Sequence, residues 1–138
     1  MPRLLPPSLL LALLLAAAGC ASTAPPLDAS DVADATASVA GLRGYVQNQG
    51  YTLFPDASFD PGLFSTNRES FSVDGGRGRL GVYAFESEAA MEQAALRLST
   101  AAFSPVWNVY EGGNLVVVYL GRDPGMLAAL GRVMDPIA

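Results

Sequence analysis

The chain has 138 residues and a net charge of −5, with 13 acidic residues, eight arginines, no lysine, no histidine and one cysteine. A single cysteine excludes a disulfide framework, and the lack of histidine and lysine removes Ser-His-Asp triads, Schiff-base catalysis and the usual zinc, copper and haem ligands. An acidic chain repels phosphate backbones, so we expect no nucleic-acid partner. From the missing residue types we expect no metal or cofactor and no enzymatic activity, with only carboxylate chemistry left open.

Residues 1–19 have the three parts of a secretory signal peptide. Arg3 supplies a positive start, an apolar run extends from Leu9 to Ala18, and small residues lead to Cys20. The apolar run is about ten residues long, half of what a helix needs to cross the hydrocarbon core of a membrane. We therefore predict a signal peptide that is removed, rather than a membrane-spanning anchor.

The last residues of this segment, Ala17, Ala18, Gly19 and Cys20, resemble the lipobox of bacterial lipoproteins. The resemblance implies cleavage before Cys20, a diacylglycerol on its thiol and a further acyl chain, such as palmitate, on its new amine. Lipoboxes usually have Leu at the position of Ala17. The alternative is a soluble secreted protein in which Cys20 is incidental.

A lipidated Cys20 would hold the protein on a membrane without a transmembrane helix, because two or more acyl chains anchor stably. We expect a location in the cell envelope. Ala21 is not the Asp that retains some lipoproteins at the inner membrane. In an organism with an outer membrane, the predicted location is therefore that membrane, at its periplasmic or surface face.

Residues 20–30 are small, polar and proline-bearing, a composition typical of a flexible tether between an anchor and a folded domain. We expect a single α+β domain over residues 31–138, because this length suits one hydrophobic core. Its first element is predicted to be one helix over 31–49, in which apolar residues recur at three- and four-residue spacing. Gly50 is well placed to end that helix in a left-handed conformation.

A short strand over 51–54 leads into a long surface loop over 55–67, where two prolines and several Asp and Gly residues disfavour regular structure. Phe59 and Phe64 are the notable residues of this loop. In one interpretation they fold back onto the core and hold the loop in place. In the other they line the edge of a binding site.

From Glu69 onward the chain shows the same succession of elements twice: a strand, a glycine-rich turn, a longer strand and a helix. Val82 and Tyr83 correspond to Val118 and Tyr119, 36 residues further on. A true internal repeat would produce two ββα units. Coincidence is the alternative, because any two hairpin–helix units share this order.

Each of these units ends in a helix with a marked start. Ser87 is a capping residue for the first, and Asp123 followed by Pro124 starts the second. The strand over 115–120 is apolar at every position, so we expect it to lie centrally, with its second face covered by the N-terminal helix over 31–49, by the loop over 55–67 or by a partner. The predicted fold is two-layer α+β, with a mainly antiparallel sheet of four or five strands and helices on one face, ferredoxin-like or related.

The half from about Phe71 to Pro136 also resembles a group of small bacterial lipoproteins with a compact α+β domain. The pieces that carry the resemblance are Val82-Tyr83-Ala84-Phe85, Ser87 to Ala90, Trp107, and Gly113 to Asp123. The resemblance implies an envelope lipoprotein. It brings no established activity and no functional residues.

Carboxylates are the catalytic groups that the composition leaves open. Asp56 and Asp60 do not have the spacing of a calcium loop and are typical turn formers. Glu86, Glu88 and Glu92 lie near the start of a predicted helix, where acidic side chains interact favourably with the helix dipole. A carboxylate-dependent envelope hydrolase is therefore an alternative function, and it requires two acidic groups about 5–10 Å apart.

Gly75, Gly76 and Gly78 superficially resemble a phosphate-binding loop. They lead into a strand rather than a helix and lack a following Lys-Ser/Thr pair, so they predict a hairpin turn. Arg77 and Arg79 beside this turn form the one local basic pair. We expect exposed side chains there, with contact to a carboxylate or a lipid headgroup as the alternative.

Aromatic residues supply the candidate binding surface, Phe59, Phe64, Tyr83 and Phe85. Core and cross-strand packing is the simpler interpretation of Tyr83 and Phe85, and an aromatic surface on an incompletely covered sheet face is the other. We favour a membrane-anchored envelope lipoprotein with a non-catalytic binding or assembly domain. Its partners would be the lipid bilayer and an envelope protein or a second copy. Small-ligand binding or sensing in an enclosed apolar pocket is a further alternative.

Overall fold

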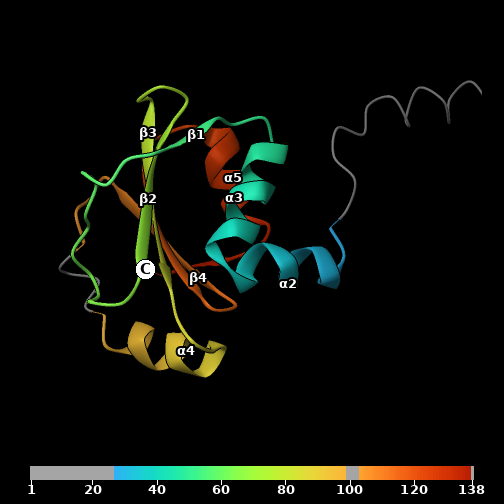
Figure 1. The fold of residues 1–138 in the computed structure, drawn as a ribbon, viewed down its shortest axis with the longest axis vertical. Coiled ribbons are helices and arrows are strands. Elements are labelled where there is room, and N and C mark those ends of the chain that lie inside the picture. Colours follow the sequence, from blue (N-terminus) through green and yellow to red (C-terminus); the bar gives the residue numbers. More distant parts are fainter. Residues whose placement is uncertain (1–26, 99–102, 138) are drawn as a thin grey trace, which may run out of the picture.

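The computed structural model describes residues 27–98 and 103–137 (Figure 1). Within these ranges the elements are, in chain order, α2 (Ala29–Ala37), α3 (Val39–Asn48), β1 (Leu53–Pro55), β2 (Arg68–Val73), β3 (Gly78–Ala84), α4 (Glu88–Leu96), β4 (Trp107–Gly112), β5 (Leu115–Leu120), α5 (Pro124–Gly131) and β6 (Asp135–Pro136). The predicted signal peptide, the lipobox residues Ala17, Ala18, Gly19 and Cys20, and residues 20–26 of the predicted tether lie outside the described residues. None of the described helices is long and apolar enough to cross a membrane.

The described strands form one antiparallel sheet in the order β1-β2-β3-β5-β4-β6. The α+β class and the antiparallel sheet are therefore confirmed. β5 lies inside the sheet between β3 and β4, and its residues from Leu115 to Tyr119 are buried, as expected for an apolar strand covered on both faces. The sheet has six strands rather than four or five, because β6 is only two residues long and leaves no periodic signal in the sequence.

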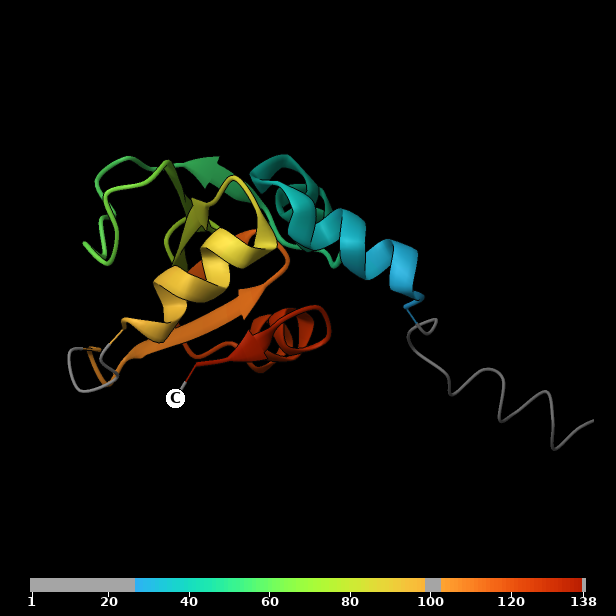
Figure 2. The same cartoon turned by 90° about the horizontal axis from the view of Figure 1, so that it is seen from below.

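Successive side chains of the central strands point to opposite faces of the sheet, and different elements cover the two faces. Val82 and Val117 pack with residues of α2, α3 and α5, on the side that we call the three-helix face. Tyr83 and Val116 pack with α4 and with the loop between β1 and β2, on the side that we call the loop face (Figures 1 and 2). We expected the helices on one face, whereas α4 and the loop together cover the other.

The C-terminal half consists of two ββα units, β2-β3-α4 and β4-β5-α5. Tyr83 and Tyr119 hold equivalent places in the two units, but Tyr83 faces α4 and Tyr119 faces the three-helix face. The cause is the register of the central pair, in which Tyr83 lies opposite Val116. Tyr119 lies three positions after Val116, an odd number, so the two tyrosines face opposite sides of the sheet. α4 packs on the side of Tyr83, and α5 packs on the side of Tyr119.

The prediction of one helix over 31–49 is wrong. The chain forms two helices, α2 and α3, that meet at Ser38, whose backbone is extended with φ −156° and ψ 162°. The Ser38 hydroxyl oxygen accepts a hydrogen bond from the Gly41 N–H at 3.0 Å and so caps α3. A Cβ at Gly41 would overlap the carbonyl oxygen of Asp34, so glycine is what allows α2 to approach α3 this closely.

Short polar side chains cap the other helix starts. Ser87 and Asp123 each accept a hydrogen bond at 3.1 Å from the backbone N–H three residues later, which confirms the predicted starts of α4 and α5. Asp28 caps α2 in the same way at 2.9 Å, so the folded domain begins slightly before the predicted residue 31. Gly50 follows α3 with φ 100°, the left-handed conformation expected of it.

The hydroxyl of Tyr51, just before β1, donates a hydrogen bond to the Asp123 carboxylate at the start of α5. Partial burial, this hydrogen bond and the negative charge of Asp123 raise the pKa of Tyr51 to about 12. A raised pKa means that folding favours the neutral phenol. This contribution to stability is therefore complete below the ordinary tyrosine pKa of 10.0 and is lost as the pH rises toward 12.

We expect Tyr51→Phe to lose less stability than the wild-type protein as the pH rises through this interval. Urea unfolding at about pH 9 and about pH 12 measures the free energy of unfolding of each protein at both ends. The difference between the two proteins isolates Tyr51, because the other tyrosines are common to both. An identical loss in the two proteins would show that the Tyr51–Asp123 contact does not couple protonation to folding.

Candidate functional site

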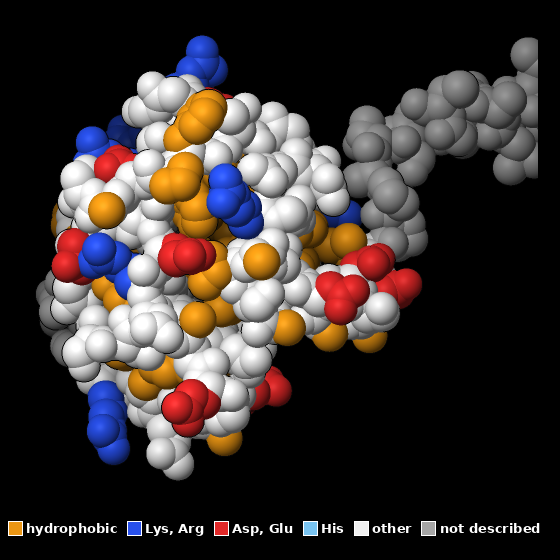
Figure 3. Space-filling view, in the orientation of Figure 1, with side chains coloured by type: hydrophobic (Ala, Val, Ile, Leu, Met, Phe, Trp, Pro, Cys, Tyr) orange, Lys and Arg blue, Asp and Glu red, His pale blue; other side chains and the backbone are white. Residues whose placement is uncertain are grey.

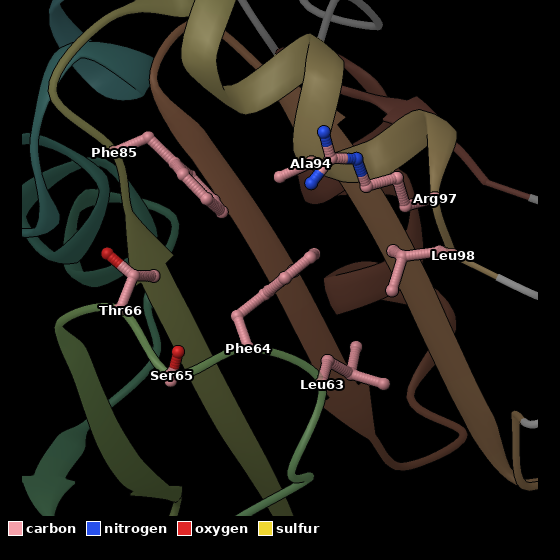
Figure 4. Close-up of a pocket in the computed structure, with 8 residues that line it drawn as sticks. All are labelled: Leu63, Phe64, Ser65, Thr66, Phe85, Ala94, Arg97 and Leu98. Carbon is pink, nitrogen blue, oxygen red and sulfur yellow. The ribbon is translucent and has the colours of Figure 1, made fainter.

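A hollow of about 390 Å³ lies on the loop face, between the β1–β2 loop and α4 (Figure 4). We call it the loop–α4 hollow. Its volume is within the range of about 300–1,000 Å³ that is common for small-molecule sites. The residues that line it come from the loop, from the segment after β3 and from the last part of α4 and its following residues: Leu63, Phe64, Ser65, Thr66, Phe85, Ala94, Arg97 and Leu98.

The floor of the hollow is aromatic. The Phe64 ring meets both Tyr83 and Phe85 edge to face, with ring centroids 5.2 Å apart in each pair. Phe64 and Phe85 are half-buried and line the hollow, whereas Phe59 and Tyr83 are buried in the core beneath it. The four aromatic residues singled out in the sequence therefore belong to one cluster. Two of them face the hollow and two support it.

Hydrogen bonds fix the loop that forms one wall. The Ser70 hydroxyl of β2 donates to the Phe59 carbonyl oxygen at 2.6 Å, and both residues are buried. The Leu63 N–H donates to the Tyr83 hydroxyl oxygen at 3.2 Å. Phe59 thus follows the first interpretation, in which the loop folds back onto the core, and Phe64 both packs on the core and lines the hollow.

An ion pair between Asp60 of the loop and Arg68 of β2 holds the same segment. The hydrogen bond from Arg68 lowers the pKa of Asp60 below its ordinary value, and the Gly62 N–H, which donates to Asp60 at 2.9 Å, acts in the same direction. Asp60 therefore stays ionised in mildly acidic solution. The wall of the hollow does not depend on a group that titrates near neutral pH.

Arg97 supplies the charge at the loop–α4 hollow. Its side chain is exposed, and within the residues that the structure describes it makes no ion pair. Figure 4 shows its guanidinium on the α4 side, with Ser65 and Thr66 on the loop side. Thr66 donates its hydroxyl to the Ala84 carbonyl oxygen at 3.1 Å. Among the described residues, the hollow therefore offers an apolar floor with one cation at its edge that makes no ion pair.

The loop carboxylates act as turn formers. The Asp56 carboxylate accepts a hydrogen bond from the Ser58 N–H at 3.1 Å, and the Ser58 hydroxyl lowers the pKa of Asp56. Asp56 and Asp60 thus both have lowered pKa values, whereas a general acid needs a raised one. Within residues 27–98 and 103–137 no three His, Cys, Asp or Glu side chains are grouped as metal ligands.

Sequence reasoning missed Arg97 and the apolar walls that Leu63, Ala94 and Leu98 provide. Leu63 precedes Phe64 in the loop that we had already considered as the edge of a binding site, so its position in the sequence could have indicated that it lines the hollow. Ala94, Arg97 and Leu98 have the three- and four-residue spacing of one helix side. That spacing places them together, but only the packing of α4 over the loop face shows what they line.

Comparisons with known proteins give no information on the function of the chain, so its interpretation rests on the geometry described above. No protein-family model matches the chain, and no match is found among curated proteins or solved structures. The resemblance of its second half to small bacterial lipoproteins stays a prediction from the sequence.

Proposed function

We propose that the chain is a lipid-anchored protein of the cell envelope whose folded domain binds, without catalysis, a small apolar molecule that carries an acidic group. The anchor part of the proposal rests on the lipobox-like residues before and at Cys20. The binding part rests on one observation, the loop–α4 hollow, in which an aromatic floor is combined with the guanidinium of Arg97, which has no ion pair within the described residues.

The apolar contribution comes from Phe64, Phe85, Leu63 and Leu98, whose side chains converge on the hollow in Figure 4. A ligand that removes about 200 Å² of apolar surface from water there, its own and the protein's together, would gain about 5 kcal/mol. Phe64 and Phe85 are half-buried, so each ring leaves part of its surface for contact with an alkyl chain or a second ring. Shape and apolar contact therefore supply most of the affinity.

Arg97 would fix the orientation of the ligand by pairing with its acidic group. Because the side chain is exposed, water and salt screen the pair, and it adds at most about 1 kcal/mol. An open hollow with one such contact predicts modest affinity, with Kd between about 1 μM and 1 mM. This range suits a ligand that is bound and released rather than a permanent cofactor.

Isothermal titration calorimetry with decanoate and with decanol tests the proposal on the purified full chain. We expect decanoate to bind the wild-type protein more tightly than decanol. Arg97→Gln should weaken decanoate about three- to fivefold and leave decanol unchanged, since only the acid pairs with the guanidinium. Phe64→Ala should weaken both ligands at least tenfold, because it removes the centre of the floor.

Two matched variants act as controls. Phe54→Ala removes an exposed ring from β1, and Arg43→Gln removes a charge that lies over Phe71 on the three-helix face. Both should bind decanoate like the wild type. The proposal fails if neither ligand binds, or if the control variants weaken binding as much as the variants of the hollow. Arg97→Gln keeps the test valid should Phe64→Ala disturb the fold.

A further inference from the structure

Three arginines share a second hollow at the opposite end of the loop face, beside the β2–β3 turn. We call it the arginine hollow; its volume is about 310 Å³. Three of the eight basic residues of an acidic chain thus meet at one place. The hollow shares no lining residue with the loop–α4 hollow. Its lining consists of Gly76, Arg77, Gly78, Arg79, Val106, Leu120, Gly121 and Arg122.

Strand pairing brings the three arginines together from distant parts of the chain. Arg77 lies in the β2–β3 turn and Arg79 in β3, whereas Arg122 follows β5. The register sets Arg79 opposite Leu120, so the start of β3 meets the end of β5. Glycine keeps these ends close, because a Cβ at Gly78 would lie 3.1 Å from the Leu120 carbonyl oxygen.

The positive charge of this hollow is poorly compensated within the described residues. Asp56 approaches Arg79 at 3.8 Å, a long ion pair, and Arg77 and Arg122 form none. The two nearest acids in sequence keep their negative charge but form no ion pair with these arginines in the described part of the chain. Asp74 accepts a hydrogen bond from the Thr52 N–H at 2.8 Å, and Asp123 accepts one from Tyr51 and caps α5. Other exposed acids gather away from the turn, most visibly over α2 (Figure 3).

We propose that the arginine hollow is a second binding site, which takes a phosphate group attached to an apolar molecule. Guanidinium groups bind phosphate oxygens through paired N–H donors, and several of them suit a group with more than one charged oxygen. The neighbouring Val106 is 46 % exposed and is one of the few large apolar side chains in the described residues that are open to water. It offers a contact to the organic part of a phosphate ester, beside the half-buried Leu120.

Amide ¹H–¹⁵N spectra of the purified protein test this site with three soluble probes: inorganic phosphate, dihexanoyl phosphatidylglycerol and the zwitterionic dihexanoyl phosphatidylcholine. We expect the amides of Gly76, Gly78 and Gly121 to move on titration with an anionic probe. Arg77→Gln/Arg122→Gln should weaken that binding at least tenfold. Arg43→Gln/Arg132→Gln removes the same charge from α3 and from the end of α5, and should change it less than twofold.

The probes distinguish the source of the phosphate. Movement of these amides with phosphatidylglycerol supports the proposal. Movement with inorganic phosphate but not with phosphatidylglycerol would show a site for a free phosphate group and would contradict the contact assigned to Val106. Absence of movement with either anionic probe would overturn the proposal. So would equal weakening by the two double variants, because attraction to net charge alone would then account for the binding.

Discussion

Replacing Gly113 by alanine is expected to lower the free energy of unfolding by about 3 kcal/mol or more, a large part of the roughly 5–15 kcal/mol that stabilises a typical domain. Gly113 lies in the β4–β5 turn with φ 54°, a conformation that costs alanine about 1–2 kcal/mol. A Cβ there would also lie 2.5 Å from the Thr36 hydroxyl oxygen and 2.7 Å from its Cβ. Thr36 is buried at the end of α2, so the overlap must push α2 away from the sheet.

Urea unfolding followed by circular dichroism measures this effect, and Gly131→Ala is its matched control. Gly131 lies at the end of α5, and a Cβ there has no neighbour within 4 Å. Alanine in a helix is favoured over glycine by up to about 1 kcal/mol, so Gly131→Ala should leave stability unchanged or raise it slightly. An unfolding midpoint of Gly113→Ala equal to that of the wild type would contradict the role assigned to the turn.

The second large effect concerns location. Cys20→Ala is expected to move the protein from the membrane fraction to the soluble fraction almost completely, because it would remove the thiol and the new amine that we propose to be acylated. Each buried CH₂ of an acyl chain contributes about 0.8 kcal/mol, so two or three chains hold a protein firmly and their loss releases it. Fractionation of cells and intact-mass measurement of the membrane-bound protein test this directly.

The expected wild-type product begins at Cys20 and has the added mass of diacylglycerol and a fatty acyl chain. Ser22→Ala, two residues further on, is the control and should remain in the membrane fraction with the same modification. An unmodified wild-type protein released from the membrane would show that Cys20 is incidental. The binding part of the proposed function could then still hold for a secreted domain.

The starts of α4 and α5 and the tight turns were predictable because each depends on a few neighbouring residues. Ser87 and Asp123 cap helices through hydrogen bonds to their own following turn. Gly75 and Gly76 adopt φ values of 71° and 107° in the β2–β3 turn, which side chains disfavour, so the glycine pair indicated a hairpin rather than a phosphate loop. Signals of this kind need no knowledge of the rest of the fold.

The break between α2 and α3 was not predictable in this way, because the apolar stripe continues across Ser38. The end of α2 is held by a residue far along the chain. The Asn114 N–H donates to the Thr36 carbonyl oxygen at 2.9 Å, and its side-chain amide donates to the Ala37 carbonyl oxygen at 3.1 Å. These bonds satisfy carbonyl groups that α2 leaves open, and they exist only once the β4–β5 turn is in place.

The candidate binding residues also divide into those that the sequence indicated and those that only long-range packing reveals. Aromatic composition was enough to single out Phe59, Phe64, Tyr83 and Phe85, and the structure gathers all four into one cluster. Which of them support the hollow and which face it depends on the path of the loop across the sheet. Arg97 has no local feature that marks it, since its importance comes from lying opposite that loop.

By itself the sequence determined the strands other than β6, the hairpin turns, the starts of α4 and α5, and the central position of the apolar strand β5. Only the tertiary structure decided which face each helix covers. That choice depends on how β3 pairs with β5. Tyr83 lies opposite Val116, not opposite its equivalent Tyr119, and Tyr119 is an odd number of positions away from Val116. The two tyrosines, and the helices that pack on them, therefore lie on opposite faces of the sheet. The same long-range pairing sets Arg79 opposite Leu120 and brings Arg122 to Arg77. A one-residue difference in pairing changes no local preference, yet it moves every side chain of a strand to the other side of the sheet.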